Sequence, residues 1–265
     1  TYVCVTARRW AGKEEWAAAR QAEGAWRSVR AYDADDIETW LESAPAVHSW
    51  ISIQLGKHPD GIVDVETFWG GWSHTTRPGL TAEFVLSGRE KIVQQLLEWL
   101  RSSSESTAIK AESIDEAVAV VAATMLKLPP EEQLSVLSRG LVVYSQSAWD
   151  QVVRFDEPLI LIPYIDGDNS FARATRTPHR IIVPLGADGA ESATTLIVPR
   201  LSRDDAAKAL TVAGIGEERA SELAVLARRS LKAFRRKLAY RPEVQTPPWA
   251  RPKEAGALKP ALLTG

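Results

Sequence analysis

Three short runs rich in Ile, Leu and Val, each ended by a proline, constrain the fold of this chain most. A run without polar alternation is typical of a strand covered on both faces, and proline cannot continue a strand ladder. The runs are residues 159–162, 180–183 and 195–198, closed by Pro163, Pro184 and Pro199. Two further strands are expected at 107–110 and 141–144, with helical segments between them. This alternation predicts an α/β fold with a parallel sheet flanked by helices.

The 265 residues are enough for one large domain or two small ones. The first part has a β-α-β-α pattern, in which Asp33 is expected to cap a helix. The expected divisions are this small unit at 1–60, a Gly- and Pro-rich linker at 61–83, an α/β core at 84–200, a helical lid at 201–241 and a Pro-rich arm at 242–265.

Composition excludes several classes of protein. The single cysteine, Cys4, rules out a disulfide scaffold or a thiolate zinc cluster and suits a reducing, cytoplasmic location. The four histidines are too scattered to predict a metal site. No run of about 18 apolar residues exists, so no membrane partner is expected.

The usual motifs of catalysis and cofactor binding are not found. A phosphate-binding loop needs glycines followed by Lys and Ser or Thr, whereas residues 110–115 read Lys-Ala-Glu-Ser-Ile-Asp. Two acids at that place would repel a triphosphate. Asp64-Val-Glu66 is the nearest match to a nuclease metal site, but no lysine follows at the right place. We therefore predict no catalytic residue, no cofactor and no metal.

Charge is concentrated near the C-terminus, where residues 200–241 hold 11 Lys and Arg against 5 Asp and Glu. An amphipathic helix there would carry a solvated basic face, or one that contacts an acidic protein surface or nucleic-acid phosphate. The candidate contact residues are Arg228, Arg229, Lys232, Arg235, Arg236 and Lys237.

Aromatic residues are concentrated in the first 99 positions, which hold eight of the ten tryptophans. Phe68, Trp69 and Trp72 lie close together and could pack between domains or stack on a base. We take Trp69, Trp72 and Arg89 as candidate interdomain contacts.

Two stretches resemble known families. Residues 2–10 and 26–36, with Trp40-Leu41, resemble the C-terminal half of a restriction-endonuclease-like domain, as found at the head of large bacterial multidomain proteins of phage-defence type. The resemblance implies that residues 1–60 are the remnant of such a domain. The family's metal-binding Asp and Glu-x-Lys lie upstream of this strand, so no catalytic residue is carried over.

The second resemblance is to the STAND NTPases, the class that includes NACHT and NB-ARC modules. Leu86-Ser-Gly88-Arg89-Glu90 is similar to their entry motif, residues 159–163 to a later core strand, and residues 198–206 to the final strand and the turn into the helical lid. The order of elements matches over residues 84–240. The phosphate loop and the Mg²⁺-binding acid are missing, so the resemblance implies a degenerate NTPase-like module.

Together these features predict a non-catalytic coupling and scaffold segment that links a nuclease-like domain to a degenerate NTPase-like module. The chain starts mid-strand at Thr1 and ends in an apolar stretch, so we expect an internal piece of a longer protein whose other domains are its partners. Two alternatives remain open. One is a nucleotide-binding switch with an atypical loop at Glu112–Asp115, and the other is a DNA-binding module that uses residues 228–241.

Overall fold

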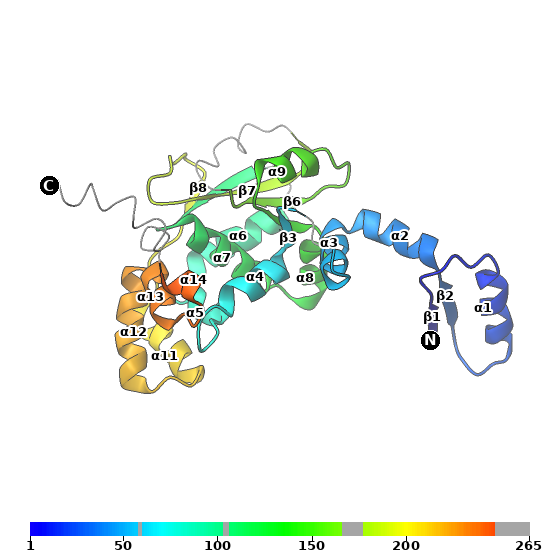
Figure 1. Cartoon of the computed structure of the whole chain (residues 1–265), viewed down its shortest axis with the longest axis horizontal. Helices are drawn as coiled ribbons and strands as arrows, with labels where there is room; N and C mark the ends of the chain where they lie inside the picture. The colour runs from blue at the N-terminus through cyan, green and yellow to red at the C-terminus, as the bar shows by residue number, and fades with distance from the viewer. Residues whose placement is uncertain (58–59, 103–105, 166–176, 247–265) are drawn as a thin grey trace. The chain divides into compact units, whose positions relative to one another are not determined.

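The computed structural model describes residues 1–57, 60–102, 106–165 and 177–246. The chain divides into two compact units, Thr1–His58 and Pro59–Gly265 (Figure 1). The division lies close to the expected end of the first domain at residue 60. The two units are described separately.

The first unit pairs two short parallel strands and adds three helices. Its elements are β1 (Tyr2–Val5), α1 (Lys13–Ala22), β2 (Val29–Tyr32), α2 (Ala34–Ser43) and α3 (Pro45–Gln54). Asp33 caps α2 as expected, and it forms a reciprocal capping box with Asp36. Lys13 donates to Asp33 at 2.8 Å, and this bond holds the pKa of the Asp33 carboxyl well below its usual range. The ion pair fixes α1 to the start of α2.

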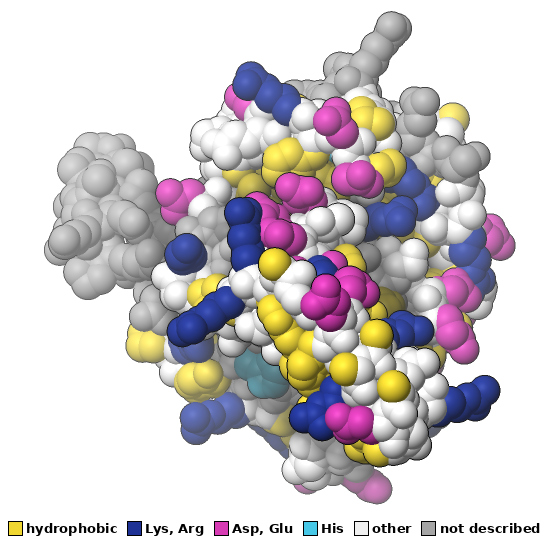
Figure 2. Space-filling view, turned by 90° about the vertical axis from the view of Figure 1, so that its right-hand side faces the viewer, with side chains coloured by type: hydrophobic (Ala, Val, Ile, Leu, Met, Phe, Trp, Pro, Cys, Tyr) yellow, Lys and Arg dark blue, Asp and Glu magenta, His cyan; other side chains and the backbone are white. Residues whose placement is uncertain are grey.

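The first unit has a small apolar core. Its buried apolar residues are Val29, Ala31 and Ala46. Large apolar side chains that stay exposed include Tyr2, Val3, Val5, Trp26, Trp40, Trp50 and Leu55. Figure 2 shows hydrophobic side chains on the surface between charged ones. Three of the five tryptophans of this unit, Trp26, Trp40 and Trp50, therefore lie at its surface.

The second unit is built on a six-stranded sheet of order β3-β5-β6-β7-β4-β8, in which every pair is parallel except β3 with β5. The strands are β3 (Ile62–Asp64), β4 (Ser106–Lys110), β5 (Gly140–Val143), β6 (Ile160–Pro163), β7 (Arg180–Leu185) and β8 (Thr195–Ile197). This is the mostly parallel, helix-flanked sheet that the apolar runs predict. Two details differ. β8 is an edge strand and is only half-buried, and β7 continues through Pro184 to Leu185 instead of ending at the proline.

Helices cover both faces of this sheet (Figure 1). They are α4 (Val65–Ser73), α5 (Ala82–Val85), α6 (Glu90–Arg101), α7 (Ile114–Met125), α8 (Pro130–Leu137) and α9 (Gln146–Val152). α7 is buried from Glu116 to Met125, because it packs against β4 and β7 on one side and against α4, α5 and α6 on the other. A helix that is apolar all round is typical of this central position.

Residues 61–83 are not the linker that their glycines and prolines predict. They contain β3, α4 and the start of α5, and Val65, Phe68 and Trp72 are buried in the main core. Gly70 and Gly71 lie within α4. Because α4 packs against α7, this segment is part of the second unit.

The C-terminal helices are α11 (Arg203–Val212), α12 (Glu217–Arg229), α13 (Leu231–Leu238) and α14 (Pro242–Gln245). α12 and α13 are separated at Ser230, whose backbone is extended and whose hydroxyl accepts the N–H of Ala233 at 3.3 Å. The expected arm at 242–265 starts instead with the short helix α14, and residues 247–265 lie outside the described residues.

His179 is a buried titratable group at the amino end of the sheet. The ring is 1 % exposed, and its Nδ1 accepts the backbone N–H of Leu159 at 3.3 Å. Burial lowers the pKa of this imidazole below its ordinary value of 6.5. The neutral ring is therefore the form that the folded protein favours.

We expect the second unit to lose stability as the pH falls below about 6.5, because the unfolded chain then takes up a proton at His179 before the folded chain does. One such group changes the free energy of unfolding by at most about 1.4 kcal/mol per pH unit. Urea denaturation at pH 7, 6 and 5 measures the change, and His179→Gln removes this group's part of it. Equal pH dependence of the two proteins would contradict the assignment.

Candidate functional site at the carboxyl edge of the sheet

The strand order places a candidate site at the carboxyl end of β4. The chain leaves β4 for the far side of the sheet, returns through β5, β6 and β7 to the strand beside β4, and then adds β8 on the other side. In open α/β sheets, ligands bind outside the carboxyl ends of the strands at such a switch point. Here β4 leads through residues 111–113 into the N-terminus of α7.

A buried ion pair occupies this position. Arg89 is 2 % exposed, and its guanidinium pairs with Glu116 in the first turn of α7. Its Nε donates to the carbonyl of Pro199 and its Nη1 to that of Val85, each at 2.9 Å. Burial lowers the pKa of Arg89, while the charge of Glu116 opposes that shift. All three nitrogens of the guanidinium therefore have acceptors within the chain.

The remaining hollow beside this pair is very small. It measures about 20 Å³ and is lined by Arg89, Glu112, Glu116, Val198, Pro199, Arg200, Leu201, Ala227 and Arg228. That volume is enough for about one water molecule, whereas pockets for small ligands measure roughly 300–1,000 Å³. At the exposed rim of the hollow, the Nη2 of Arg200 lies 3.7 Å from the carboxylate Oε1 of Glu112. The Nη1 of Arg228 donates to the carbonyl of Leu201 at 2.8 Å.

The N-terminus of α7 also carries the wrong charge for a phosphate. Ser113 caps the helix by accepting the N–H of Glu116 at 3.2 Å, and Asp115 and Glu116 fill the first turn. These carboxylates already use the favourable end of the helix dipole. The Ser113–Glu116 spacing predicts a full capping box, but the Glu116 side chain pairs with Arg89 instead.

A second arginine connects α13 to the same turn of α7. Arg235 is 9 % exposed and pairs with Asp115. Its Nη2 donates to the carbonyl of Trp72 and to the hydroxyl of Thr75, each at 3.1 Å. The guanidinium lies 4.1 Å from the centre of the Trp72 ring, in the geometry of a cation–π contact. Arg235 is therefore used inside the molecule, and we exclude it from the candidate partner contacts.

Two tyrosines complete the group around Asp115. Tyr164, directly after β6, donates its hydroxyl to Asp115 at 3.0 Å, and its ring centre lies 5.4 Å from that of Tyr144. Burial and the nearby charge of Asp115 raise the pKa of Tyr164 above its ordinary value. The same two causes raise the pKa of Tyr144 to about 12. Both phenols therefore stay neutral, and the Tyr164 hydroxyl acts as a hydrogen-bond donor to Asp115.

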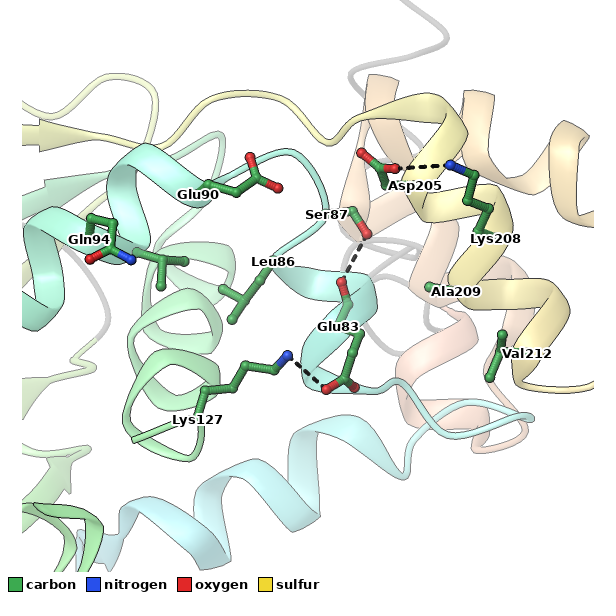
Figure 3. Close-up of a pocket in the computed structure, with 11 residues that line it drawn as sticks. Glu83, Leu86, Ser87, Glu90, Gln94, Lys127, Asp205, Lys208, Ala209 and Val212 are labelled. Carbon is green, nitrogen blue, oxygen red and sulfur yellow. Dashed lines mark hydrogen bonds and ion pairs between the residues drawn. The ribbon is translucent and has the colours of Figure 1, made fainter. Parts of the chain in front are cut away.

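A larger pocket lies between α5, α6 and α11 (Figure 3). Its volume is about 470 Å³, and Leu86, Val93, Ala209 and Val212 form its apolar part. Its charged side chains mostly pair with one another: Lys127 with Glu83 at 2.9 Å, and Lys208 with Asp205 at 3.6 Å. The hydrogen bond from Lys127 lowers the pKa of Glu83. The pocket has the size of a ligand site but presents few charges that are free to select a ligand.

The structure brings together some of the residues that the sequence singled out. Trp69 stacks on Trp72 with ring centres 5.5 Å apart, and Trp72 contacts Arg235. Trp72 and Arg89 thus connect the α/β core to the C-terminal helices within one unit. Arg228 lines the small hollow beside Arg89. Of the remaining candidates on α12 and α13, Arg229, Lys232 and Lys237 are exposed and Arg236 is half-buried.

The acids that bind these arginines were not predicted in that role. In the sequence, Glu116 stands out only as a helix-capping acid, and Asp115 as one of two acids that would repel a triphosphate. Their partners lie 27 and 120 residues away, so no local pattern could reveal the pairs. Among the described residues, no group of three or more Asp, Glu, His and Cys side chains could hold a metal ion.

The chain has no significant match among protein-family models, curated proteins or solved structures. Within the described ranges, each helix is too short or too polar to cross a membrane. Functional inference therefore rests on the geometry at the carboxyl edge of the sheet.

Proposed function

We propose that the chain is a non-catalytic coupling and scaffold segment of a bacterial defence-type protein. Residues 61–241 would form an NTPase-like module that works without nucleotide, joined to a nuclease-like domain of which residues 1–60 are a part. The observation that carries the proposal is the Arg89–Glu116 pair, which fills the switch-point crevice where a ligand would otherwise bind.

The same crevice supports a mechanical role for this module. Arg89 reaches the segment that enters α11 through the carbonyl of Pro199. Arg235 reaches back from α13 to Asp115 on α7. Arg235 thus holds α13 against α7, and Arg89 holds the segment that leads into α11. Displacing α13 requires the loss of the Arg235–Asp115 pair, and breaking a buried ion pair has a high cost in free energy. A partner domain that contacts the helices is thereby coupled to the core.

The first test is a calorimetric titration of the chain with ATP and Mg²⁺ at about 0.2 M salt, where weak surface binding of anions is screened. We expect no heat beyond that of dilution at millimolar ATP, because the crevice is filled and two acids face it. Saturable binding of one ATP per chain would contradict the proposal and favour a nucleotide-binding switch.

A matched variant strengthens this test. Glu112→Gln removes an exposed charge at the rim of the hollow while leaving the buried pair intact. If the filled crevice excludes nucleotide, this variant should also fail to bind. ATP binding that appears in the variant would mean that charge alone, rather than the occupied space, keeps nucleotide out.

A further inference from the structure

We propose that the exposed side of α13 binds the sugar–phosphate backbone of double-helical DNA without reading its sequence. We define this basic face as Lys232, Arg236 and Lys237, with Arg77 and Arg241 beside the end of the helix. The inference is independent of the filled crevice, because none of these residues lines it.

The cations on the outer side of α13 lie in a stretch of the chain that has no acidic residue. Residues 228–241 contain seven Lys and Arg and not a single Asp or Glu. Lys232, Arg236 and Lys237 make no ion pair with any described residue. Several surface cations elsewhere lie beside an acid, as in Arg101–Glu132, Lys110–Glu191 and Arg219–Glu222. An unneutralised group of cations on one short helix attracts a polyanion.

The helix presents these charges in a fixed arrangement. Lys232 and Arg236 lie four residues apart and therefore on the same side of α13, with Lys237 next to them. The opposite side is held by Leu231 and Phe234 in the core and by Arg235 on Asp115. The apolar residues of α13 are thus already used in packing, so the helix cannot insert into a membrane without leaving the fold.

Folding adds a cation that is distant in sequence. The Arg77 N–H donates to the carbonyl of Leu238 at 3.1 Å, which brings the segment at 75–77 alongside the end of α13. The Arg77 guanidinium lies 4.5 Å from the centre of the Tyr240 ring, and that of Arg241 lies 5.8 Å from it. Tyr240 is 42 % exposed. The basic face therefore continues beyond the helix around an accessible aromatic ring.

This chemistry fits phosphate better than a protein surface. Arginine forms paired hydrogen bonds with phosphate oxygens, and three of the five residues are arginines. Protein interfaces rely on buried aromatic and apolar anchors, which α13 does not expose. Each phosphate that a cation neutralises releases a counterion from DNA, so binding has a steep and countable dependence on salt.

The test measures the anisotropy of labelled 20-base-pair duplexes of two unrelated sequences, titrated with the full chain from about 50 to 200 mM salt. The unmodified chain should bind both duplexes alike. The triple variant Lys232→Gln, Arg236→Gln and Lys237→Gln should bind at least about 10-fold more weakly at 50 mM salt. Its slope of log K against log salt should be shallower by about 2 to 3, at about 0.9 per lost contact.

A second triple variant, Lys91→Gln, Arg154→Gln and Arg203→Gln, serves as the matched control. It makes the same change in net charge at exposed cations on other elements that have no ion pair with described residues. It should bind like the unmodified chain. Thermal unfolding monitored by circular dichroism shows whether each variant is folded, and Lys232→Gln alone replaces the first triple if that one is not.

Several outcomes would overturn the inference. These are no DNA binding by the unmodified chain at 50 mM salt, equal weakening in both triple variants, or equally tight binding of polyglutamate. Binding to anionic lipid vesicles that exceeds binding to DNA would assign the basic face to a membrane surface instead.

Discussion

Replacing Arg89 with methionine is expected to lower the free energy of unfolding of the Pro59–Gly265 unit by about 3–5 kcal/mol, the usual cost of leaving a buried charge without its partner. Glu116 is 5 % exposed and has Arg89 as its ion-pair partner. Methionine fills much of the same space but donates no hydrogen bond, so the carbonyls of Val85 and Pro199 also lose their donor. Urea denaturation followed by circular dichroism measures the change.

The double variant Arg89→Met with Glu116→Leu separates charge from packing. It removes both ions, and replacement of a buried pair by apolar residues is often neutral or stabilising. We expect the double variant to be more stable than Arg89→Met alone, with a remaining deficit from the two orphaned carbonyls. If Arg89→Met costs less than about 1 kcal/mol, or the second change adds to the loss, the pair is not the buried connection described above.

Gly88→Ala is expected to destabilise the same unit by about 3 kcal/mol or more, because two effects act at one position. Gly88 has φ +69°, a conformation that costs L-residues about 1–3 kcal/mol. A Cβ there would also lie 3.0 Å from the backbone nitrogen of Ser202 and closer still to its side chain. Ser202 cannot move easily, since its N–H donates to the carbonyl of Ser87 at 2.9 Å and its hydroxyl caps α11.

Two other glycines provide controls for this prediction. Gly214 has φ +93°, but an added Cβ would lie in open space, so Gly214→Ala reports the conformational cost alone. Gly70 lies within α4, and an added Cβ there would meet no neighbouring element, so Gly70→Ala should be neutral or stabilising by up to about 1 kcal/mol. An equal decrease in the free energy of unfolding for Gly88→Ala and Gly214→Ala would show that the contact with Ser202 does not contribute to the destabilisation.

The sequence predicts the regular elements well because their signals are local. Four-residue apolar runs locate β6 and β7, and the caps Asp33, Ser113 and Ser202 locate helix starts to within a residue or two. The glycine-rich composition of residues 61–83 wrongly predicts a linker. A helix forms there because burial of Phe68 and Trp72 in the core outweighs the low helix propensity of Gly70 and Gly71.

The site could be predicted only in part, since it depends on contacts between distant segments. The missing phosphate loop is visible in residues 110–115, but the arginine that fills its place comes from residue 89. The helical pattern of residues 231–238 marks the basic helix correctly. It cannot distinguish Arg235, which turns inward to Asp115, from Arg236, which stays outside, because that depends on where the core lies.

The first turn of α7 has a consequence for how this chain could change over evolution. Asp115 and Glu116 are adjacent, and each is tied to an arginine from a different part of the unit. A glycine-rich loop that binds nucleotide could replace this turn only if the Arg89–Glu116 and Arg235–Asp115 pairs were both lost. A single substitution at Asp115 or Glu116 would therefore leave one of the two arginines without its acidic partner.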